Sequence, residues 1–551
     1  MRKQFLIGST VVVLLIFLLG FFHRGWLWLL LIALPLVLVG VYDMNQVRHS
    51  LRRNFPLIGR GRWVFESFRP FIRQYLLESD TDGAPINRMF RSVVYQRAKG
   101  ARDTIALGTK VDTYREGYEW IAHSIAAIDL PEHPEPPRVM IGGSQCTQPY
   151  SASLLNISAM SFGSLSSNAI SALNRGAHKG GFAHNTGEGG ATPYHLESGG
   201  DLIWQIGTGY FGCRTPEGDF APDAFRQVSH QPNIKMIEIK LSQGAKPGHG
   251  GILPAAKNTI EIAKIRGVKP NTRVDSPPQH NAFSSPLELM HFIAQLRELS
   301  GGKPVGFKLC VGRHSEVVAL CKAMLETGIT PDFITVDGGE GGSGVSPLEF
   351  SNSIGMPLRD GLAFVCDCLS GFGLKQDIRV IAVGKMFSAF HIVKNLSLGA
   401  DLVYSARGMM LALGCVQSLI CNTNHCPTGI ATQDAELIKG LVVTDKSERV
   451  ARFHSETLER LMEIVAAAGL SSPRELNRTH IFRRINYASI RRYDEIFPYL
   501  TPGCLRSDDY PDRFRQPMLE SSADSFLPQN NIARFDDGYQ QVDVLEKEVS
   551  A

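Results

Sequence analysis

The chain has 551 residues, of which 44% are hydrophobic and 20% are charged, and its formal net charge is +4. Such a length supports one large hydrophobic core or two medium ones. Because the charge is modest and no long basic run carries interleaved aromatic residues, the composition argues against a nucleic-acid partner. Glycine is unusually frequent, with 53 residues, many of them in loops such as NTGEGG, KPGHGG and VDGGEGGSG, where a backbone can approach a ligand closely.

Two uncharged apolar segments come first, at residues 5–22 and 26–42. Each is close to the length that spans about 30 Å of hydrocarbon at a rise of about 1.5 Å per residue. Pro35 is tolerated inside such a helix. We therefore predict a transmembrane helical hairpin over residues 1–45. A cleaved signal peptide is the alternative, but no small-x-small cleavage site follows the first segment and a second span comes at once.

Basic residues around these segments predict their orientation. Arg2 and Lys3 precede them, and arginines follow at positions 48, 52, 53, 60 and 62. The positive-inside rule then places both ends in the cytoplasm. We expect a two-pass protein of the inner (cytoplasmic) membrane with its catalytic domain in the cytoplasm. In that reducing compartment the ten cysteines are not expected to form disulfides, which leaves metal binding, catalysis or burial.

Residues 46–149 have a mixed character. WVFESFRPFIRQYLLES, at 63–79, has the apolar spacing of a helix that Pro70 would start or kink. LPEHPEPPRVMIGG, at 130–143, is typical of a proline-rich linker. We predict a mixed helical and proline-rich linker region without a catalytic constellation.

Residues 150–480 alternate between short β-branched runs and amphipathic helical stretches, which predicts parallel strands with right-handed crossovers. Polar residues follow the runs, and the last two end in VGK (383–385) and SARG (405–408), where barrels of this type hold a phosphate. We predict an α/β fold, a (β/α)8 TIM barrel. A doubly wound open sheet is the competitor, but no G-x-G-x-x-G follows the first strand. Residues 481–551 are predicted to form a C-terminal tail.

Eight sequence blocks in this region carry a family resemblance. They are SAMSFGSLS, NTGEGG, QIGTGYFG, EIKLSQGAKPGHGG, SPPQH, GFKL, VDGGEGGSGVSPLEF and GCVQSLICNTNHCPTGIATQ. With these blocks in this order, residues 157–433 resemble the FMN-binding synthase domain of glutamate synthases. The whole chain resembles the shorter FMN-binding glutamate-synthase-like proteins. The resemblance implies an FMN-binding barrel.

Three closely spaced cysteines, Cys415, Cys421 and Cys426, form the pattern C-x5-C-x4-C within the last of these blocks. Soft thiolates select iron-sulfur clusters or zinc, and the resemblance implies that these three are the ligands of a 3Fe-4S cluster. Zinc would need a fourth ligand, for which only the adjacent His425 is near in sequence. Two further interpretations stay open: inert buried cysteines, and a 4Fe-4S cluster completed by a distant cysteine.

The resemblance also assigns residues to FMN. The phosphate is expected at the ends of the last two strands, held by backbone N–H groups and a helix N-terminus, at Gly384, Lys385, Ala406, Arg407 and Gly408. The expected ring and polar contacts are Ala159, Met160, Ser161, Gln205, Lys308, Asp337, Gly338 and Gly339. Lys308 ends a buried strand, so it needs an anion, either the reduced flavin ring or a carboxylate across the barrel mouth. Ordinary strand–helix turns are the alternative for the phosphate residues.

On the substrate side, the resemblance implies that Lys246 and Arg266 bind the carboxylates of a 2-oxo acid, and that Glu188 handles protons or ammonium. Two positions depart from the pattern of the large synthases. Ile252 replaces a glutamine, and an aliphatic side chain cannot hydrogen-bond a keto acid. Tyr210 replaces an arginine. Both changes bear on the identity of the substrate and not on flavin binding.

We therefore predict a membrane-tethered FMN and iron-sulfur oxidoreductase of the EC 1.4 class, which reductively aminates 2-oxoglutarate with ammonia. The first cysteine is Cys146, so we expect no N-terminal glutaminase nucleophile, and we expect ammonia or another amine from solution or from a partner. Without a dinucleotide fingerprint, the expected electron donor is ferredoxin or a reductase. The alternatives are an N-methylglutamate-synthase-like subunit, a quinone-linked amino-acid dehydrogenase, and a non-catalytic membrane electron-relay subunit. Homo-oligomerisation is left open.

Overall fold

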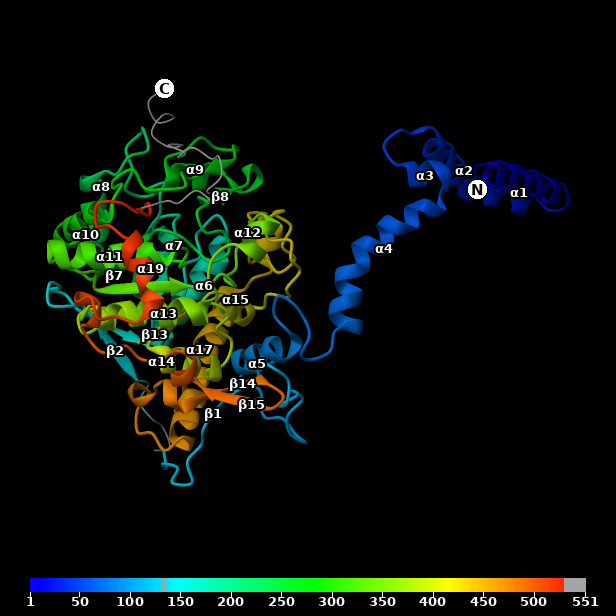
Figure 1. Cartoon of the computed structure of the whole chain (residues 1–551). Helices are drawn as coiled ribbons and strands as arrows, with labels where there is room; N and C mark the ends of the chain where they lie inside the picture. Colours follow the sequence, from blue (N-terminus) through cyan, green and yellow to red (C-terminus); the bar gives the residue numbers. More distant parts are fainter. Residues whose placement is uncertain (131–134, 136, 530–551) are drawn as a thin grey trace, which may run out of the picture. The chain divides into compact units, whose positions relative to one another are not determined.

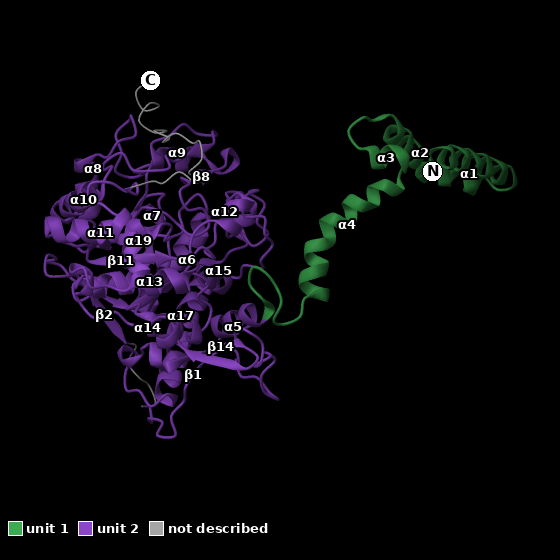
Figure 2. Ribbon diagram, in the orientation of Figure 1, with its two compact units in different colours: residues 1–88 green, residues 89–551 purple. Residues whose placement is uncertain are grey.

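The computed structural model describes residues 1–130, 135 and 137–529 (Figure 1). Two compact units divide the chain between Arg88 and Met89 (Figure 2). The predicted proline-rich linker falls partly outside the described residues, as does the last part of the predicted tail, residues 530–551.

The first unit is helical. It contains α1 (Arg2–Phe22), the 3-10 helix η1 (Arg24–Leu29), α2 (Leu30–Asn45), α3 (Ser50–Asn54), α4 (Ile58–Ile72) and the π-helical turn η2 (Arg73–Leu77). The pair α1 and α2 packs together, and a Cβ on Gly40 would lie 2.1 Å from the ring of Phe5. Most of their apolar side chains are exposed. By length and composition, the helices over Arg2–Phe22 and Arg24–Asn45 suit a membrane crossing.

The second unit is built on a closed barrel of eight parallel strands. They are β4 (Leu155–Ile157), β5 (His184–Asn185), β6 (Leu202–Ile206), β7 (Ile234–Lys240), β10 (Val305–Leu309), β11 (Phe333–Asp337), β12 (Arg379–Val383) and β13 (Leu402–Ser405). The last strand pairs with the first, as Val403 opposite Leu155 and Ser405 opposite Ile157. This closure confirms the predicted barrel and excludes the open sheet.

Helices surround the strands. They are α6 (Ser167–Gly180), α7 (Pro193–Leu196), α8 (Pro222–Ser229), α9 (Ile260–Arg266), α10 (Pro286–Leu299), α11 (His314–Thr327), α12 (Leu348–Ser353), α13 (Leu358–Gly371), α14 (Ala389–Leu398), α15 (Arg407–Leu413), α16 (Ala435–Lys439) and α17 (Val443–Ala467). The longest of these, α17, packs against α6, α14 and α15. Local sequence explains where α6 lies: Ser166 Oγ accepts from Ala169 N at its start, and Gly181 ends it in a left-handed conformation.

Further elements lie outside the barrel. They are α5 (Arg88–Lys99), β1 (Glu119–Ile121), β2 (Arg138–Ile141), β3 (Tyr150–Ser153), β8 (Ile252–Leu253), β9 (Val274–Asp275), β14 (Ile481–Asn486), β15 (Ser489–Arg492), α18 (Tyr493–Ile496) and α19 (Arg515–Glu520). Part of the predicted tail is thus folded: β14 and β15 form a sheet with β1. In addition, Lys322 Nζ on α11 donates to the carbonyl oxygens of Met518 and Ser521.

Candidate active site

Charged side chains gather where the barrel strands end. Lys240 is the last residue of β7, Asp337 is the last residue of β11, and Lys308 lies one residue before the end of β10. Lys308 is opposite Lys240 across one strand pair and opposite Thr335 across the next, so these ends share one rim. In a parallel barrel the carboxyl ends of the strands form the functional face.

Lys308 and Asp337 form an ion pair inside this rim. Lys308 Nζ lies 3.1 Å from Asp337 Oδ2, and each side chain is 7% exposed. Burial opposes the charge on Lys308, but Asp337 and Glu238 outweigh it and hold the pKa of Lys308 above its ordinary value. Asp337 Oδ2 also accepts from Gly244 N, whereas Oδ1 is buried with no hydrogen-bond partner among the described residues. An acceptor is therefore left for a ligand donor.

Glu238 lies deeper in the barrel and accepts three hydrogen bonds. Asn185 Nδ2 and Gln205 Nε2 donate to Oε2 at 2.8 and 2.6 Å, and Thr335 Oγ1 donates to Oε1 at 2.7 Å. Gln205 is expected to contact FMN, and in the structure its amide nitrogen donates to Glu238. Glu238 itself is not among the residues predicted from the sequence. The signal that points to it is a carboxylate in the middle of the apolar run KMIEIKL.

Around Glu188 the structure brings three cations together. Glu188 Oε2 lies 2.8 Å from Lys240 Nζ. Burial favours the protonated carboxyl, but Lys240, Lys246 and Arg266 outweigh it and hold the pKa of Glu188 below its ordinary value. Three cations about one carboxylate leave an excess of positive charge, which suits an anionic ligand. We call Glu188, Lys240, Lys246 and Arg266 the rim cluster.

The other two rim cations are strongly buried. Burial lowers the pKa of Lys246 to about 8 and that of Arg266 to about 10, and Glu188 opposes both shifts. Arg266 donates to the Phe162 carbonyl oxygen at 2.9 Å, and its guanidinium lies 5.0 Å from the centre of the Phe211 ring. The carbonyl bond and the aromatic contact fix the guanidinium beside Glu188.

Glycine permits this crowding. A Cβ on Gly251 would lie 1.9 Å from Glu188 Oε1, and a Cβ on Gly187, whose φ is +64°, would lie 2.7 Å from Ser161 N. The NTGEGG loop therefore packs directly on the Ala159–Met160–Ser161 segment that follows β4.

Tyr210 and Ile252, the two departures from the family pattern, lie near this cluster. Tyr210 accepts from Ala282 N at 3.2 Å, and its hydroxyl lies 3.0 Å from His280 Nδ1. The other ring nitrogen of His280 lies 3.0 Å from the Lys240 carbonyl oxygen, and burial lowers the pKa of His280 to about 4. A neutral His280 thus donates to the Lys240 carbonyl oxygen and accepts from the Tyr210 hydroxyl. Tyr210 and His280 therefore support the end of β7 that carries Lys240. Ile252 is half-buried on β8.

At the ends of β12 and β13, Lys385 and Arg407 form a second cationic group. Burial and then repulsion by Arg407 lower the pKa of Lys385, and burial lowers the pKa of Arg407. Arg407 Nη2 donates to the Glu340 carbonyl oxygen at 2.9 Å. Within the described part of the chain neither cation has an ion-pair partner at 4.0 Å or less. A dianion placed between them would relieve their repulsion.

Glycines permit close packing at the ends of β11, β12 and β13. A Cβ on Gly408 would lie 2.4 Å from Ser405 Oγ, one on Gly339 would lie 2.7 Å from the Gly355 carbonyl oxygen, and one on Gly338 would lie 2.3 Å from Glu340 Oε2. Gly384 follows β12 with a φ of +149°, and Ala406 directly precedes α15. All five predicted phosphate residues and the two glycines after Asp337 therefore lie along the same rim.

Cys415, Cys421 and Cys426 share one loop after α15. Burial raises the pKa of Cys415 to about 11, and Cys421 and Cys426 add to the shift, so the three thiols interact electrostatically. Burial also acts on Cys426, but the Thr428 hydroxyl and nearby backbone N–H groups hold its pKa below the ordinary value. Among the residues that the structure describes, no three His, Cys, Asp or Glu side chains are grouped to hold a metal ion. The three thiols therefore share one loop and affect one another's pKa, but in the described structure they are not arranged as a set of metal ligands.

Hydrogen bonds place the cysteine loop beside the rim. Asn424 Nδ2 donates to the Ala256 carbonyl oxygen at 3.2 Å, and Gln433 Nε2 donates to the Leu165 carbonyl oxygen at 2.9 Å. Three residues of the loop other than glycine have positive φ: Gln417, Leu419 and Asn424. His425, the fourth ligand considered for zinc, is exposed.

Residues 107–471 match the family model described as the conserved region in glutamate synthase. The chain belongs to the glutamate synthase family. It is 37% identical over 508 residues to the glutamate synthase large subunit-like protein YerD of Bacillus subtilis (strain 168), covering 85% of this chain and 96% of that relative. The match to the archaeal glutamate synthase (NADPH) of Methanocaldococcus jannaschii is 33% over 319 residues, covering 57% of this chain and 59% of the relative.

The large chain of glutamate synthase (NADPH) from Bacillus subtilis (strain 168) is 31% identical over 322 residues, which cover 57% of this chain and 20% of that relative. These matches confirm the resemblance seen in the sequence blocks. They assign the chain to a family of oxidoreductases.

Proposed function

We propose that this chain is a membrane-tethered FMN and iron-sulfur oxidoreductase of the glutamate synthase type, which converts a 2-oxo dicarboxylate and ammonia into an amino acid. The observation that carries the proposal is the rim cluster, in which Lys240, Lys246 and Arg266 surround Glu188 at the mouth of a glutamate-synthase-family barrel. The cluster has three cations and only one carboxylate of its own, Glu188. The remaining positive charge can neutralise the two carboxylates of a substrate.

The residues of the rim cluster have different roles in the proposed reaction. Arg266, fixed by Phe162 and Phe211, and Lys246 bind and orient the two carboxylates. Condensation of the keto carbon with ammonia releases water and gives an imine. Glu188, ionised among its cations, would accept a hydrogen bond from the nitrogen donor beside the keto carbon. Lys246, with a pKa of about 8, exchanges protons near neutral pH.

FMN fits the residues along the rim. Lys385 and Arg407 would hold the phosphate, because both are half-buried cations without an ion pair in the described chain. Asp337 Oδ1 would accept from a ligand hydroxyl or N–H, and Lys308 would face the ring. When bound, FMN supplies the hydride that reduces the imine carbon. Lys308 stays charged above neutral pH because Asp337 and Glu238 raise its pKa.

A 3Fe-4S cluster would be held by Cys415, Cys421 and Cys426. Their chemistry suits the group: three soft donors share one loop beside the rim, and the hydrogen bonds to Cys426 favour its thiolate. Ferredoxin or a reductase is the proposed electron source. Cys421→Ser should abolish the iron EPR signal of the purified protein. Cys504→Ser, outside the loop, is the matched control, and an unchanged signal in Cys421→Ser would assign the iron to other ligands.

The membrane assignment rests on α1 and α2, whose length and apolar composition suit two crossings of the cytoplasmic membrane. The arginines that follow α2 favour a cytoplasmic barrel.

The decisive experiment is a substrate panel on the purified holoenzyme with chemically reduced ferredoxin. We expect glutamate from 2-oxoglutarate and ammonium, and isothermal titration should detect binding of the dicarboxylate. Ile252 and Tyr210 favour one alternative, amine transfer to or from glutamate, so methylamine and monocarboxylic 2-oxo acids belong in the panel. Binding of no dicarboxylate and turnover of no amine would overturn the proposal in favour of an electron-relay subunit.

A further inference from the structure

Residues 58–77, which we call the interfacial segment, expose an unusual amount of apolar surface. The segment comprises α4 and η2. Phe65 is 69% exposed, Phe68 55% and Leu76 77%, and further exposed apolar residues are Ile58, Val64, Phe71, Ile72, Tyr75 and Leu77. A continuous apolar patch of this kind on a folded protein marks a contact with a partner or with a membrane.

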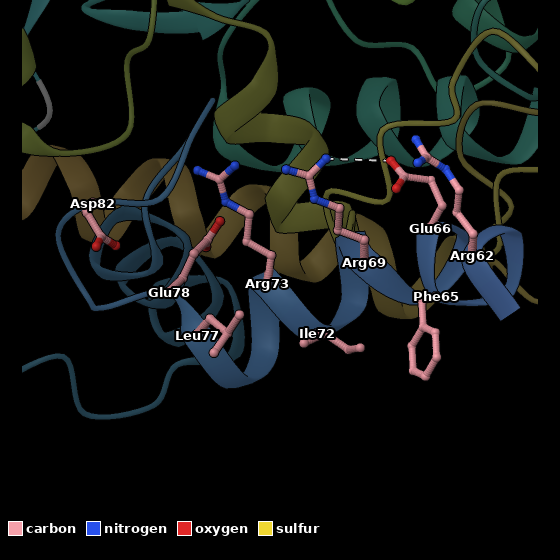
Figure 3. Close-up of a pocket in the computed structure, with 9 residues that line it drawn as sticks. All are labelled: Arg62, Phe65, Glu66, Arg69, Ile72, Arg73, Leu77, Glu78 and Asp82. Carbon is pink, nitrogen blue, oxygen red and sulfur yellow. Dashed lines mark ion pairs between the residues drawn. The ribbon is translucent and has the colours of Figure 1, made fainter.

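The patch occupies one side of a helix, with arginines along its edge. Ile58, Phe65 and Ile72 recur at intervals of seven residues, so they lie on one face. Arg62, Arg69 and Arg73 follow a parallel strip beside that face. In Figure 3 the side chains of the three arginines point away from those of Phe65, Ile72 and Leu77. All six residues line one shallow pocket, together with Glu66, Glu78 and Asp82. The ion pair between Arg69 and Glu66, at 3.5 Å, is highly exposed and so worth little.

An ion pair joins the start of this segment to the end of the apolar hairpin. Arg60 contacts both carboxylate oxygens of Asp43 at 2.8 Å, and Leu57 N donates to the same carboxylate at 3.2 Å. The Asp43 side chain is fully buried. Because Asp43 lies in the last turn of α2, α4 begins at the level where α2 ends. It runs at an angle to α1 and α2 and does not extend them (Figure 1).

We propose that the interfacial segment lies on the surface of an anionic bilayer, with its apolar face among the acyl chains and Arg62, Arg69 and Arg73 bound to lipid phosphates. The inference rests on the proposed membrane anchoring, since Asp43 and Arg60 then place the start of α4 at the headgroups. A helix with aromatic and aliphatic residues on one side and arginines along the boundary has the pattern of a surface-lying amphipathic helix. Long arginine side chains reach the phosphates while their stems lie against apolar surface.

Within residues 58–77 four arginines stand against one carboxylate, Glu66, so the segment carries a net positive charge that favours anionic lipid. Its positive charge comes from arginines, whose planar guanidinium binds phosphate oxygens in a bidentate manner. A second copy of the chain would bring the same arginines against one another. The Asp43–Arg60 ion pair also joins the start of this segment to the end of α2, whose apolar side chains are exposed, so one bilayer can contact both.

Hydrogen–deuterium exchange on the full chain in nanodiscs tests the proposal. One nanodisc contains phosphatidylcholine alone and the other contains added phosphatidylglycerol. We expect amide exchange over residues 58–77 to be slower by at least about tenfold in the anionic disc, since each basic residue near such a surface strengthens binding about fivefold. About 1 M salt should remove the difference, because it shortens the screening length to about 3 Å.

The triple variant Arg62→Gln, Arg69→Gln and Arg73→Gln should lose the difference between the discs while the barrel amides keep their protection. The matched control replaces three exposed arginines of the second unit with glutamine: Arg175, Arg226 and Arg491. Equal exchange in the two discs, or protection that survives the triple replacement or rises with protein concentration, would overturn the proposal. A chain that enters neither disc would also overturn it, and that result would trace the failure to the hairpin and not to the interfacial segment.

Discussion

Lys246 is the rim residue whose charge depends most on pH near neutrality. Burial lowers its pKa to about 8 while Glu188 opposes the shift. The ammonium form exists below this pKa and is lost as the pH rises through it. Arg266, with a pKa of about 10, remains charged over that interval. The proposed dicarboxylate site therefore has one cation that titrates near neutral pH and one that does not.

Replacing Lys246 with glutamine should weaken dicarboxylate binding about tenfold to a hundredfold, since one hydrogen bond to a charged group is lost. The native protein should lose affinity as the pH rises through about 8, and Lys246→Arg should move that loss to higher pH. Isothermal titration over a pH series that brackets this value measures both effects. Lys264→Gln is the matched control, because Lys264 is an exposed lysine on α9 near Arg266. An unchanged affinity in Lys246→Gln would remove this residue from the binding site.

Arg407→Gln should raise the dissociation constant of FMN about tenfold to a hundredfold, because the phosphate would lose a half-buried cation. Quenching of FMN fluorescence by the apoprotein measures this directly. Arg379→Gln, at the opposite end of β12, is the control. Equal retention of FMN by both variants would place the phosphate elsewhere on the rim.

The residues that sequence reasoning misses share one property: they act through neighbours from another part of the chain. Glu238 accepts hydrogen bonds from β5, β6 and β11, and His280 supports Lys240 through a backbone carbonyl. Spacing along the sequence shows none of these partners. Lys246, Arg266 and Glu188 are predictable because the family resemblance implies them, and the structure places them together.

At the scale of elements, the contact between α6 and α17 depends on a residue without a side chain. A Cβ on Gly176 would lie 2.7 Å from Val450 and 2.9 Å from the Ser447 carbonyl oxygen, both on α17. Gly176 faces the partner helix, whereas the adjacent Arg175 is exposed. The two helices therefore approach closely at Gly176.

Gly176→Val should destabilise the protein by about 2 kcal/mol, because the well-packed interface must separate to admit the new side chain. Arg175→Val introduces the same residue on the exposed face of the same helix and should cost much less. Chemical unfolding of both variants, followed by circular dichroism, gives the comparison. A similar loss in both would mean that helix propensity, and not the contact with α17, limits stability.

Strand length decides which elements the sequence can reveal. Strands β7, β10, β11 and β12 are each at least five residues long and carry apolar residues at most positions, so they are recognisable from the sequence. β5 consists only of His184 and Asn185, and both are polar, so no periodicity marks it. It is a strand because its backbone pairs with β4 and β6 on either side.

At the scale of the whole molecule, the hairpin should hold the chain in membranes that have been washed with alkaline carbonate. Leu14→Arg together with Leu34→Arg should release it, since a charge near the centre of each helix costs about 3 kcal/mol on insertion. The control pair, Leu519→Arg and Leu527→Arg, also replaces exposed leucines but lies in the second unit. Native protein that washes off in carbonate would contradict the membrane assignment.

The fold class was predictable because alternating strands and helices leave few topologies. Eight family blocks then identified the barrel, and the closed ring confirms it. The folding of residues 481–529 was not predictable, because β14 and β15 pair with β1, which lies far earlier in the chain, at Glu119–Ile121. Pairing over that distance leaves no trace in local composition.

The pairing of β4 with β13 has a consequence for biosynthesis. Leu155–Ile157 can find Leu402–Ser405 only after the ribosome has made both, which at about 5–20 residues per second takes many seconds. The apolar α1 and α2 emerge long before that. The nascent chain therefore exposes its most hydrophobic helices while the barrel is still an unclosed set of strands, and early capture of those helices by a membrane would keep them away from the open strand edges.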